Sequence, residues 1–177
     1  MAGTREITVW DHFVRAFHWS VASAFLLDFW VLEEGDPPHE WVGYFLGAML
    51  ILRITWGFIG PHNARFVNFF PTPSRVTKHL SDLRHNRLDH AEGHNPLGGA
   101  MVIALMLMLA TVAMSGWMLT WDMFWGSSLM EDIHNISAEV TMILVVIHVA
   151  AIIIMGRITR IPLIRTMITG KRTVSKY

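Results

Sequence analysis

The sequence predicts an all-α integral membrane protein, a four-helix bundle with both termini on the cytoplasmic side. Hydrophobic residues make up 53% of the 177 residues and charged residues only 16%, a balance too apolar for the wet surface of a soluble domain. Four apolar stretches are long enough to cross a bilayer. The chain shows no internal repeat and no second domain, so residues 1–177 are expected to form a single membrane domain.

The expected helices follow from the apolar stretches, because crossing the hydrocarbon takes about 20 apolar residues. They cover approximately residues 12–33, 39–60, 95–121 and 131–157. The first is the least apolar, since Arg15, His18 and Asp28 lie inside it, and hydropathy alone would underestimate it. Polar groups of this kind face a bundle interior and find partners there.

The basic residues indicate the orientation, since Lys and Arg are retained on the cytoplasmic side of short loops. With four spans, the two termini and the loop at residues 61–94 share one side, and all 14 Lys and Arg residues lie there. The opposite side carries acidic residues and no basic ones: Asp28, Glu33, Glu34, Asp36, Glu40, Asp122, Glu131, Asp132 and Glu139. This distribution predicts cytoplasmic termini.

The loop at residues 61–94 is too long for a turn and contains a helical pattern. Its apolar face would hold Val76, His79, Leu80 and Leu83. Basic residues surround this face, which is typical of a helix that lies in the headgroup layer. Its aromatic anchors would be Phe66, Phe69 and Phe70, and residues 161–168 show a similar pattern. Packing between helices would give the same spacing, so both interpretations stay open.

Histidines occur at two depths on the predicted helices. His134 and His148 are fourteen residues apart, nearly four helical turns, so both lie on one face about 21 Å apart along the axis. His18 lies near the cytoplasmic surface, at the level of His148. His39 lies near the outer surface, at the level of His134. The sequence therefore predicts two pairs of imidazoles, one near each membrane surface.

An imidazole in hydrocarbon is costly unless its nitrogens are satisfied. An iron porphyrin between two imidazoles satisfies one nitrogen of each ring, and a backbone or side-chain acceptor can hold the other. A single intramembrane His is more often a helix-to-helix hydrogen bond or part of a proton relay. Zinc would need its ligands in one shell. Four imidazoles at matched depths instead favour two haems, with the iron ligands His18, His39, His134 and His148.

The propionates of a porphyrin require cations at the membrane boundary. Arg53 stands fourteen residues after His39 on the same helix face and fits at the inner level, and Arg15 is a second candidate. Five glycines could let a macrocycle approach, but bare helix packing explains them better: Gly43, Gly47, Gly98, Gly99 and Gly116. Met114 and Met118 are assigned to packing rather than to axial ligation.

The remaining histidines are expected at the inner surface, solvated or facing headgroups: His12, His62, His79, His85, His90 and His94. His94 and Asn95 stand directly before the third helix, where polar donors could hold a quinone carbonyl. A plain helix cap explains Asn95 equally well. The chain has no cysteine, which excludes disulfides, iron–sulfur clusters and covalently attached haem.

Short runs spread over nearly the whole chain carry a family resemblance. They are Arg15 with His18 and Trp19, His39 with Gly43 and Tyr44, Arg53 with Trp56 and Gly57, residues 93–98, and His134 with His148. Together they resemble the bacterial cytochrome b561 family, and most closely its b-type cytochrome subunits of nickel-iron hydrogenases and the related cytochromes linked to c-type haem proteins. The resemblance implies a four-helix bundle with two non-covalent haem b groups, ligated as His18 with His148 and His39 with His134.

The function implied is that of an electron-transfer subunit in an oxidoreductase system of the bacterial inner membrane. Its redox partners would be a periplasmic c-type cytochrome or hydrogenase subunit and the membrane quinone. The protein itself would contact lipid, and no nucleic acid is expected to bind. Two axial histidines fill both open positions of an iron and favour outer-sphere electron transfer. The alternative is a stand-alone superoxide:quinone oxidoreductase of the same family, although an acidic outer side does not attract a small anion. A haem-free transporter or structural bundle is a third hypothesis.

Overall fold

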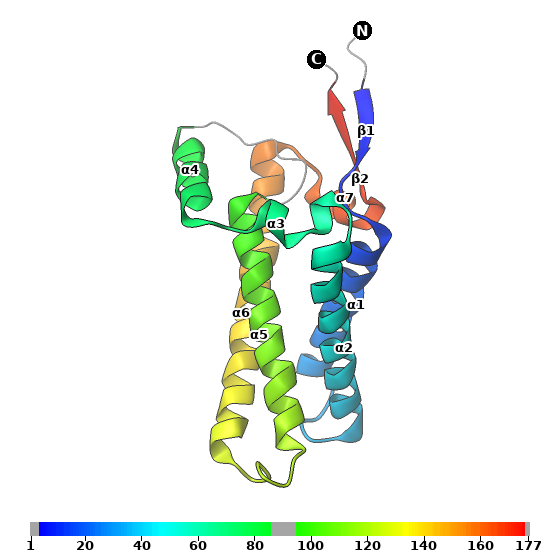
Figure 1. Ribbon diagram of the computed structural model, residues 1–177, viewed down its shortest axis with the longest axis vertical. Coiled ribbons are helices and arrows are strands. Elements are labelled where there is room, and N and C mark those ends of the chain that lie inside the picture. Colours follow the sequence, from blue (N-terminus) through cyan, green and yellow to red (C-terminus); the bar gives the residue numbers. More distant parts are fainter. Residues whose placement is uncertain (1–3, 86–94, 176–177) are drawn as a thin grey trace. The chain divides into compact units, whose positions relative to one another are not determined.

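The computed structural model describes residues 4–85 and 95–175, which are largely helical (Figure 1). The chain divides into two compact units. The first unit comprises residues 1–16, 56–101 and 148–177, and the second comprises residues 17–55 and 102–147. The long helices contribute to both units, because the unit limits fall within them. The single membrane domain expected from the sequence stays a prediction.

The elements follow one another as a strand, seven α-helices and a second strand within the described residues, with one 3-10 turn at His62–Ala64. Their bounds are β1 Thr4–Thr8, α1 His12–Trp30, α2 Pro37–Ile59, α3 Phe66–Phe69, α4 Pro73–Arg84, α5 Pro96–Leu119, α6 Ser128–Thr159, α7 Leu163–Thr169 and β2 Lys171–Ser175. The long helices α1, α2, α5 and α6 correspond to the four predicted helices, with ends that differ by at most three residues. The helix predicted in the loop corresponds to α4.

Polar caps and proline start the helices. Asp11 Oδ1 accepts a hydrogen bond from the Val14 amide at 3.0 Å at the start of α1. Asn95 Oδ1 accepts one from the Gly98 amide at 2.7 Å at the start of α5. Such side-chain acceptors satisfy the free N–H groups of a first helical turn. Proline is the first residue of α2, α4 and α5, where its missing N–H would have had no partner in the helix.

In the second unit, segments of four helices pack around one apolar cluster. Phe25 of α1, Leu46 of α2 and Leu109 of α5 are buried at its centre, and Met142 and Val145 of α6 pack against them. Each helix buries one apolar stripe against the others, which is how a helical domain forms its core. The core of this unit therefore draws on α1, α2, α5 and α6 together.

Three helices in the described part of the chain are long and apolar enough to cross a membrane, namely α2, α5 and α6. Large apolar side chains are exposed on them, such as Ile51 and Phe58, as expected where helices contact lipid. The chain is thus a helical membrane protein. Helix α1 does not meet the same standard, since its 19 residues include Arg15, His18 and Asp28. A fourth span stays a prediction.

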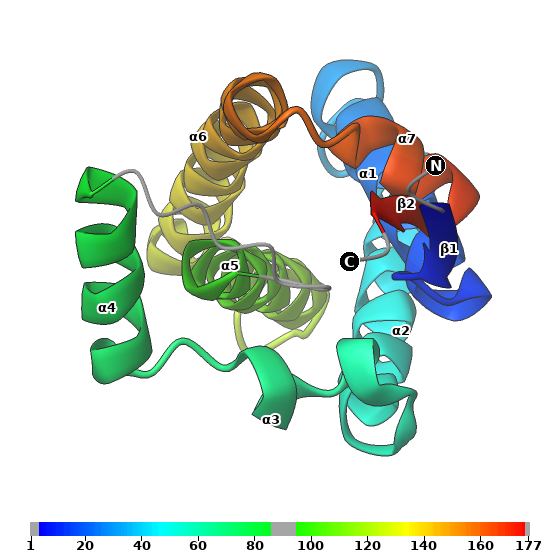
Figure 2. The ribbon, with the colours of Figure 1, turned by 90° about the horizontal axis from the view of Figure 1, so that it is seen from above.

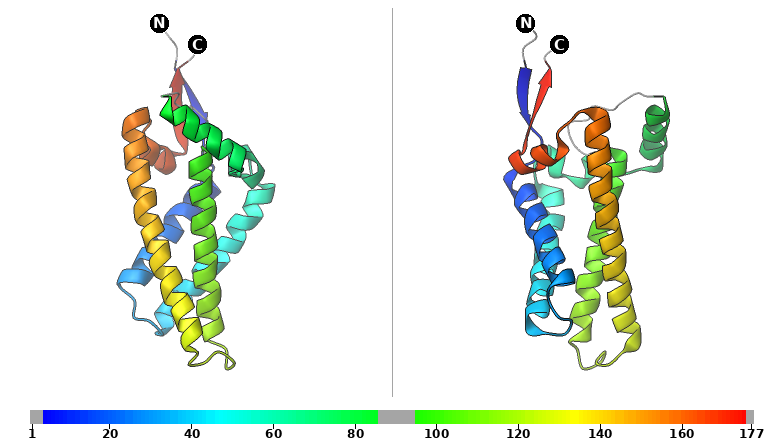
Figure 3. Two further views of the ribbon diagram at one scale, coloured as in Figure 1. Left: turned by 90° about the vertical axis from the view of Figure 1, so that its left-hand side faces the viewer. Right: turned by 180° about the vertical axis from the view of Figure 1, so that it is seen from behind.

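In the first unit, a small antiparallel sheet joins the two ends of the chain (Figure 3). Strand β1 pairs with β2 so that Glu6 stands opposite Thr173. Gly170 ends α7 with a φ of 78° and turns the chain into β2, and a Cβ there would lie 2.6 Å from the Trp10 carbonyl oxygen. The all-helical prediction omitted this sheet, because its two five-residue strands pair over nearly the whole chain length and leave no local pattern.

Also in the first unit, α3 and α4 lie beside the start of α5 (Figure 2). The Phe66 ring fills the space that Gly57 leaves open at the end of α2, and the Phe69 carbonyl lies against Gly99 in α5. Glycine on a facing helix offers the flat surface that such close packing needs. Phe66 and Phe69 thus pack against other helices, whereas Phe70 is exposed. A position of this loop in the headgroup layer stays a prediction.

Candidate functional site

Two histidines of the second unit lie close together. His39 stands in the first turn of α2 and His134 in the second turn of α6, and both are half-buried. The centres of the two imidazole rings are 6.0 Å apart, and the ring planes are inclined at 81°. These two residues are called the outer pair here, after the membrane side on which the sequence places them. The structure thus brings together one of the two predicted pairs.

The backbone of α5 orients His134. The Nδ1 atom of His134 lies 3.1 Å from the Val112 carbonyl oxygen and 3.2 Å from Ser115 Oγ. Ser115 Oγ donates its own hydrogen to the Thr111 carbonyl at 2.7 Å, so it can accept from the ring. A carbonyl oxygen only accepts, and Nδ1 must therefore carry the ring proton. The Nε2 atom of His134 is left with a lone pair, which is the form that binds a metal.

A carboxylate orients His39. Its Nδ1 atom lies 3.1 Å from Asp28 Oδ1 of α1, at ion-pair distance although not aligned as a straight hydrogen bond. The Asp28 side chain is only 12% exposed, so little water competes for the contact. A carboxylate only accepts, so its nearness favours a proton on Nδ1 of His39, and in that tautomer Nε2 carries the lone pair. In both rings of the outer pair, Nδ1 thus faces an acceptor and Nε2 is the nitrogen that could bind a metal.

Asp28 is a residue of the site that the sequence analysis did not assign to it. Asp28 was counted on the acidic outer side and expected to face the bundle interior with a partner, but no partner was named. The available signal was a single carboxylate inside an apolar helix, at the same level as a histidine of the next helix. Such intramembrane acids almost always have a polar partner. Sequence spacing could not say which partner, because the rotation of α1 against α2 is set by packing.

The 6.0 Å between the ring centres matches the space that a metal ion needs between two imidazoles. Two metal–nitrogen bonds of about 2 Å each and the radii of the two rings add up to about 6 Å. An edge-to-face ring contact spans a similar distance. In a pair of metal ligands, the ring nitrogen that does not bind the metal faces an acceptor. Here the Nδ1 atoms of both His39 and His134 face acceptors. The donor set therefore fits an axially ligated iron porphyrin.

Glycines shape the space around the pair. A Cβ on Gly116 would lie 3.0 Å from His134 Cε1, so the missing side chain makes room for this ring against α5. Gly43 lies one turn after His39, and a Cβ there would meet nothing within 4 Å. Gly47 makes only an ordinary helix contact, with Ala113 at 3.8 Å. The surroundings are thus close-fitting behind His134 and open beside His39, as a flat macrocycle between the helices would require.

One face of α6 connects the two predicted depths. Ser137 and Thr141 are both 3% exposed, and they lie between His134 and His148 at helical spacing on the same face. This buried polar stripe is the side of α6 that faces protein rather than lipid. His148 belongs to the first unit and His18 to the second, and their pairing stays a prediction.

The two candidate cations for propionates lie in different surroundings. Arg53 in α2 is 3% exposed, and a guanidinium so deeply buried requires acceptors inside the protein. Arg15 in α1 donates from Nη2 to the Ile168 carbonyl of α7, and its Nη1 lies 3.4 Å from His12 Nδ1. Arg15 is therefore held within the first unit, where it ties α1 to α7. A propionate contact stays a prediction for both arginines.

The candidate quinone residues are described only in part. Asn95 acts as the cap of α5, so its Oδ1 is occupied and only its amide nitrogen remains to donate to a ligand. His94 and His90 lie outside the described residues. Among the other inner histidines, His12, His62 and His85 are exposed. His79 is 5% exposed, so the prediction of a solvated side chain is wrong, whereas a position facing headgroups stays a prediction.

A helical membrane protein that presents imidazoles from two helices at the separation of axial ligands falls in the class of membrane-bound b-type cytochromes. The comparison with protein families agrees with this class. The family of prokaryotic cytochrome b561 matches residues 9–170, and the chain belongs to this family, as the resemblance predicted. Neither the curated proteins nor the solved structures include a match. The protein is thus a membrane cytochrome that binds haem b and transfers electrons.

Proposed function

We propose that this cytochrome holds two haem b groups and carries electrons between a periplasmic redox protein and the quinone of the bacterial inner membrane. His39 and His134 would bind the outer haem, and His18 and His148 the inner one. The observation that carries the proposal is the outer pair. Its ring centres are 6.0 Å apart, and both Nδ1 atoms face acceptors so that both Nε2 atoms are available.

The face of α6 supports the second haem. His148 continues the buried polar stripe of Ser137 and Thr141, so it points to the same side of the helix as His134. The fourteen residues between the two histidines correspond to about 21 Å along the axis. His18 is the histidine of α1 that the four-span arrangement brings to the level of His148.

The paired chain ends support four membrane spans. Strand β1 pairs with β2 in one small sheet, which supports termini on the same side of the membrane and an even number of crossings. Three helices in the described part of the chain already meet the criteria for a span, and α1 is the helix that makes the number even. The side is cytoplasmic because the flanking loops carry the basic residues.

The chain's own residues orient and tune the cofactor site. Haem b held by these imidazoles would supply a one-electron couple. Val112 and Ser115 fix the ring of His134, and Asp28 fixes the ring of His39 while adding a negative charge. Such outer partners hold a ligand in its binding tautomer. Arg53 would neutralise a propionate from within the protein, with Arg15 as the second cation.

The acidic outer side suits a redox partner with a positively charged docking face, such as a c-type cytochrome or a hydrogenase subunit. On the inner side, the amide nitrogen of Asn95, together with His94, would hold a quinone carbonyl at the start of α5. This placement lets electrons pass along the haems between the two membrane surfaces.

A reduced-minus-oxidised spectrum with haem quantitation tests the proposal. Purified protein from cells supplied with haem should show a b-type spectrum and bind about two haems per chain. A single haem per chain would contradict the second pair. A colourless preparation would contradict haem binding altogether and favour a transporter or structural bundle.

Superoxide consumption separates the proposed subunit from a stand-alone enzyme. The purified cytochrome is mixed with superoxide and a soluble quinone, and the decay of superoxide is followed with and without protein. The proposed function predicts no acceleration beyond spontaneous decay, and electron flow only when a reduced partner is added. Rapid catalytic consumption by the cytochrome alone would contradict it.

A further inference from the structure

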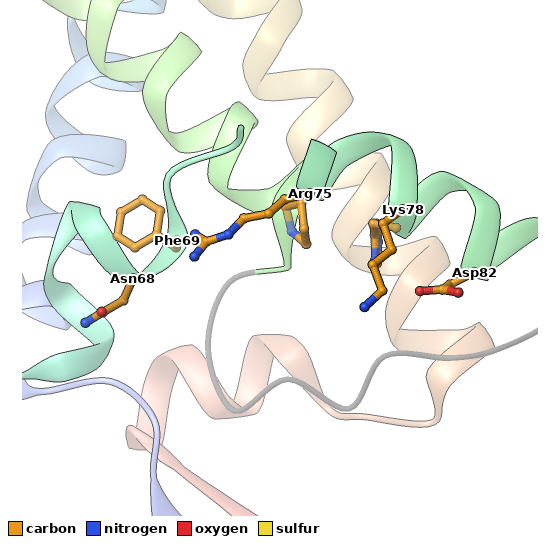
Figure 4. A pocket seen from close by; sticks show the side chains of 7 residues that line it. Asn68, Phe69, Arg75, Lys78 and Asp82 are labelled. Carbon is orange, nitrogen blue, oxygen red and sulfur yellow. The ribbon is translucent and has the colours of Figure 1, made fainter. Parts of the chain in front are cut away.

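The first unit contains a pocket beside α4 that none of the proposed haem ligands lines (Figure 4). Its volume is about 390 Å³. Helix α4 contributes Arg75, Lys78, His79 and Asp82 to it. These positions follow the spacing of one helix face. Phe69 of α3 also lines it, as does Pro96, the first residue of α5, so the pocket lies where the loop meets the start of a candidate membrane span.

His79, one of the residues that line this pocket, carries a buried polar atom without a partner in the described part of the chain. The side chain is 5% exposed, and its Nε2 atom is buried without a hydrogen-bond partner among the described residues. Buried polar atoms nearly always have a partner from protein, water or ligand. Phe69 and Pro96 line the same pocket with apolar groups that cannot fill this role. The lining of the pocket therefore includes a residue whose buried nitrogen a bound group could satisfy.

Two cations stand at the rim of the pocket. Arg75 and Lys78 are exposed, and the described residues provide neither of them with a salt bridge. Among the described residues, the Arg75 guanidinium lies 3.4 Å from the Phe70 carbonyl oxygen. Guanidinium and ammonium groups next to an imidazole nitrogen match the oxygens of a phosphate. Asp82 lines the pocket as well and offsets one of the two charges.

We propose that this pocket binds the phosphate of an anionic phospholipid. Arg75 and Lys78 contact the phosphate oxygens, and His79 Nε2 donates to one of them. The site lies at the start of α5, at the depth of the headgroups, because α5 is apolar enough to span the membrane. Exposed apolar side chains in α3, directly after it and in α4 provide contacts for the acyl chains: Val67, Phe70 and Leu80. Basic pockets at membrane helix ends are typical lipid sites.

Native mass spectrometry of the full haem-loaded chain in neutral detergent tests this site. Phosphatidylglycerol and phosphatidylcholine are titrated separately, and the lipid-bound fraction gives an apparent Kd for each. The wild type should bind phosphatidylglycerol more tightly than phosphatidylcholine. In the double variant Arg75→Gln, Lys78→Gln, the affinity for phosphatidylglycerol should fall roughly thirtyfold, since each of the two cations contributes a similar share of the attraction to an anionic lipid. Equal affinity of the wild type for both lipids would overturn the proposal.

The matched control removes the same charge elsewhere in the first unit. Lys171→Gln with Arg172→Gln changes two cations of β2 that do not line the pocket. This control should bind phosphatidylglycerol as the wild type does. An equal loss in both double variants would mean that surface charge alone attracts the lipid. Excess inorganic phosphate should not displace the lipid, and displacement would assign the pocket to free phosphate instead.

Two further single variants probe the pocket from within. His79→Gln keeps a donor near the position of Nε2 and should retain most of the lipid affinity, whereas His79→Leu should lower it. Asp82→Asn removes the opposing charge and should strengthen binding of phosphatidylglycerol but not of phosphatidylcholine. Weaker binding by the Asp82→Asn protein would contradict an anionic ligand, and because Asp82 is partly exposed, this variant does not depend on a change in the core.

Discussion

The two imidazoles of the outer pair are held by acceptors of different charge. His134 shares its Nδ1 proton between a backbone carbonyl and a hydroxyl at 3.1 and 3.2 Å, while His39 faces the carboxylate of Asp28 at 3.1 Å. A carboxylate at ion-pair distance acts on the ring through its charge, whereas the carbonyl and the hydroxyl act through neutral hydrogen bonds. Helix α5 therefore fixes the position of the His134 ring, whereas Asp28 of α1 places a negative charge beside the His39 ring.

The largest effect is expected from removing a ligand, because the comparison predicts that both rings bind iron despite their different partners. His39→Ala and His134→Ala should each lower the haem content by about half. His148→Ala should remove the other haem and leave the outer one. Haem extraction with protein quantitation measures the loss, and the spectrum of the remaining haem identifies it. Loss of both haems from either outer variant would mean that the two pairs do not form independently.

A smaller effect is expected from crowding only one of the two rings. In Gly116→Ala, the added Cβ would lie 3.0 Å from His134 Cε1, so the ring must shift although its acceptors remain. Haem affinity of the outer site should fall on the order of tenfold, as for other changes that misplace a ligand. Competition with apomyoglobin measures haem retention.

Gly47→Ala is the matched control for this crowding. Its Cβ would meet Ala113 at an ordinary 3.8 Å in the same unit, so haem retention should stay at the wild-type level. Equal loss in the two alanine variants would attribute the effect to helix packing rather than to the ligand ring.

Local patterns explain why much of the fold could be predicted. The ends of α2 and α5 are set by apolar length and by proline, and both signals are read from neighbouring residues. The sheet of β1 and β2 was missed because its partners are separated by almost the entire chain. A solvated His79 was wrongly predicted because helical spacing shows that α4 has two faces but not which of them is buried.

In the candidate site, too, features that follow from local spacing could be predicted, whereas contacts set by packing could not. His39 and His134 were predicted to meet because depth in a membrane can be counted along each helix at 1.5 Å per residue. Asp28 lies at the same depth, but its contact with His39 depends on how α1 is rotated about its axis. Rotation is set by side-chain packing of the kind seen at Phe25, and a single sequence does not encode it in a countable spacing.

Removing the charge while keeping the shape sharpens the comparison further. Asp28→Asn keeps an acceptor for His39 Nδ1 but loses the negative charge that favours ferric iron. The midpoint potential of the outer haem should therefore rise, on the order of 50 mV for a change of about 1 kcal/mol in a one-electron couple. A potentiometric titration followed in the haem absorption bands measures it. A fall in potential, or no change, would show that Asp28 does not act on this ligand.

The smallest effect is expected from a change at His134, whose acceptors are neutral. Ser115→Ala removes one of two acceptors of His134 Nδ1, but the Val112 carbonyl remains at 3.1 Å and no charge is lost. The potential of the outer haem should move by less than about 20 mV, because a neutral hydrogen bond with a remaining substitute contributes little net free energy. Haem content should be unchanged, which the same extraction assay checks. A shift as large as that of Asp28→Asn would mean that hydrogen-bond number, and not charge, distinguishes the two ligands.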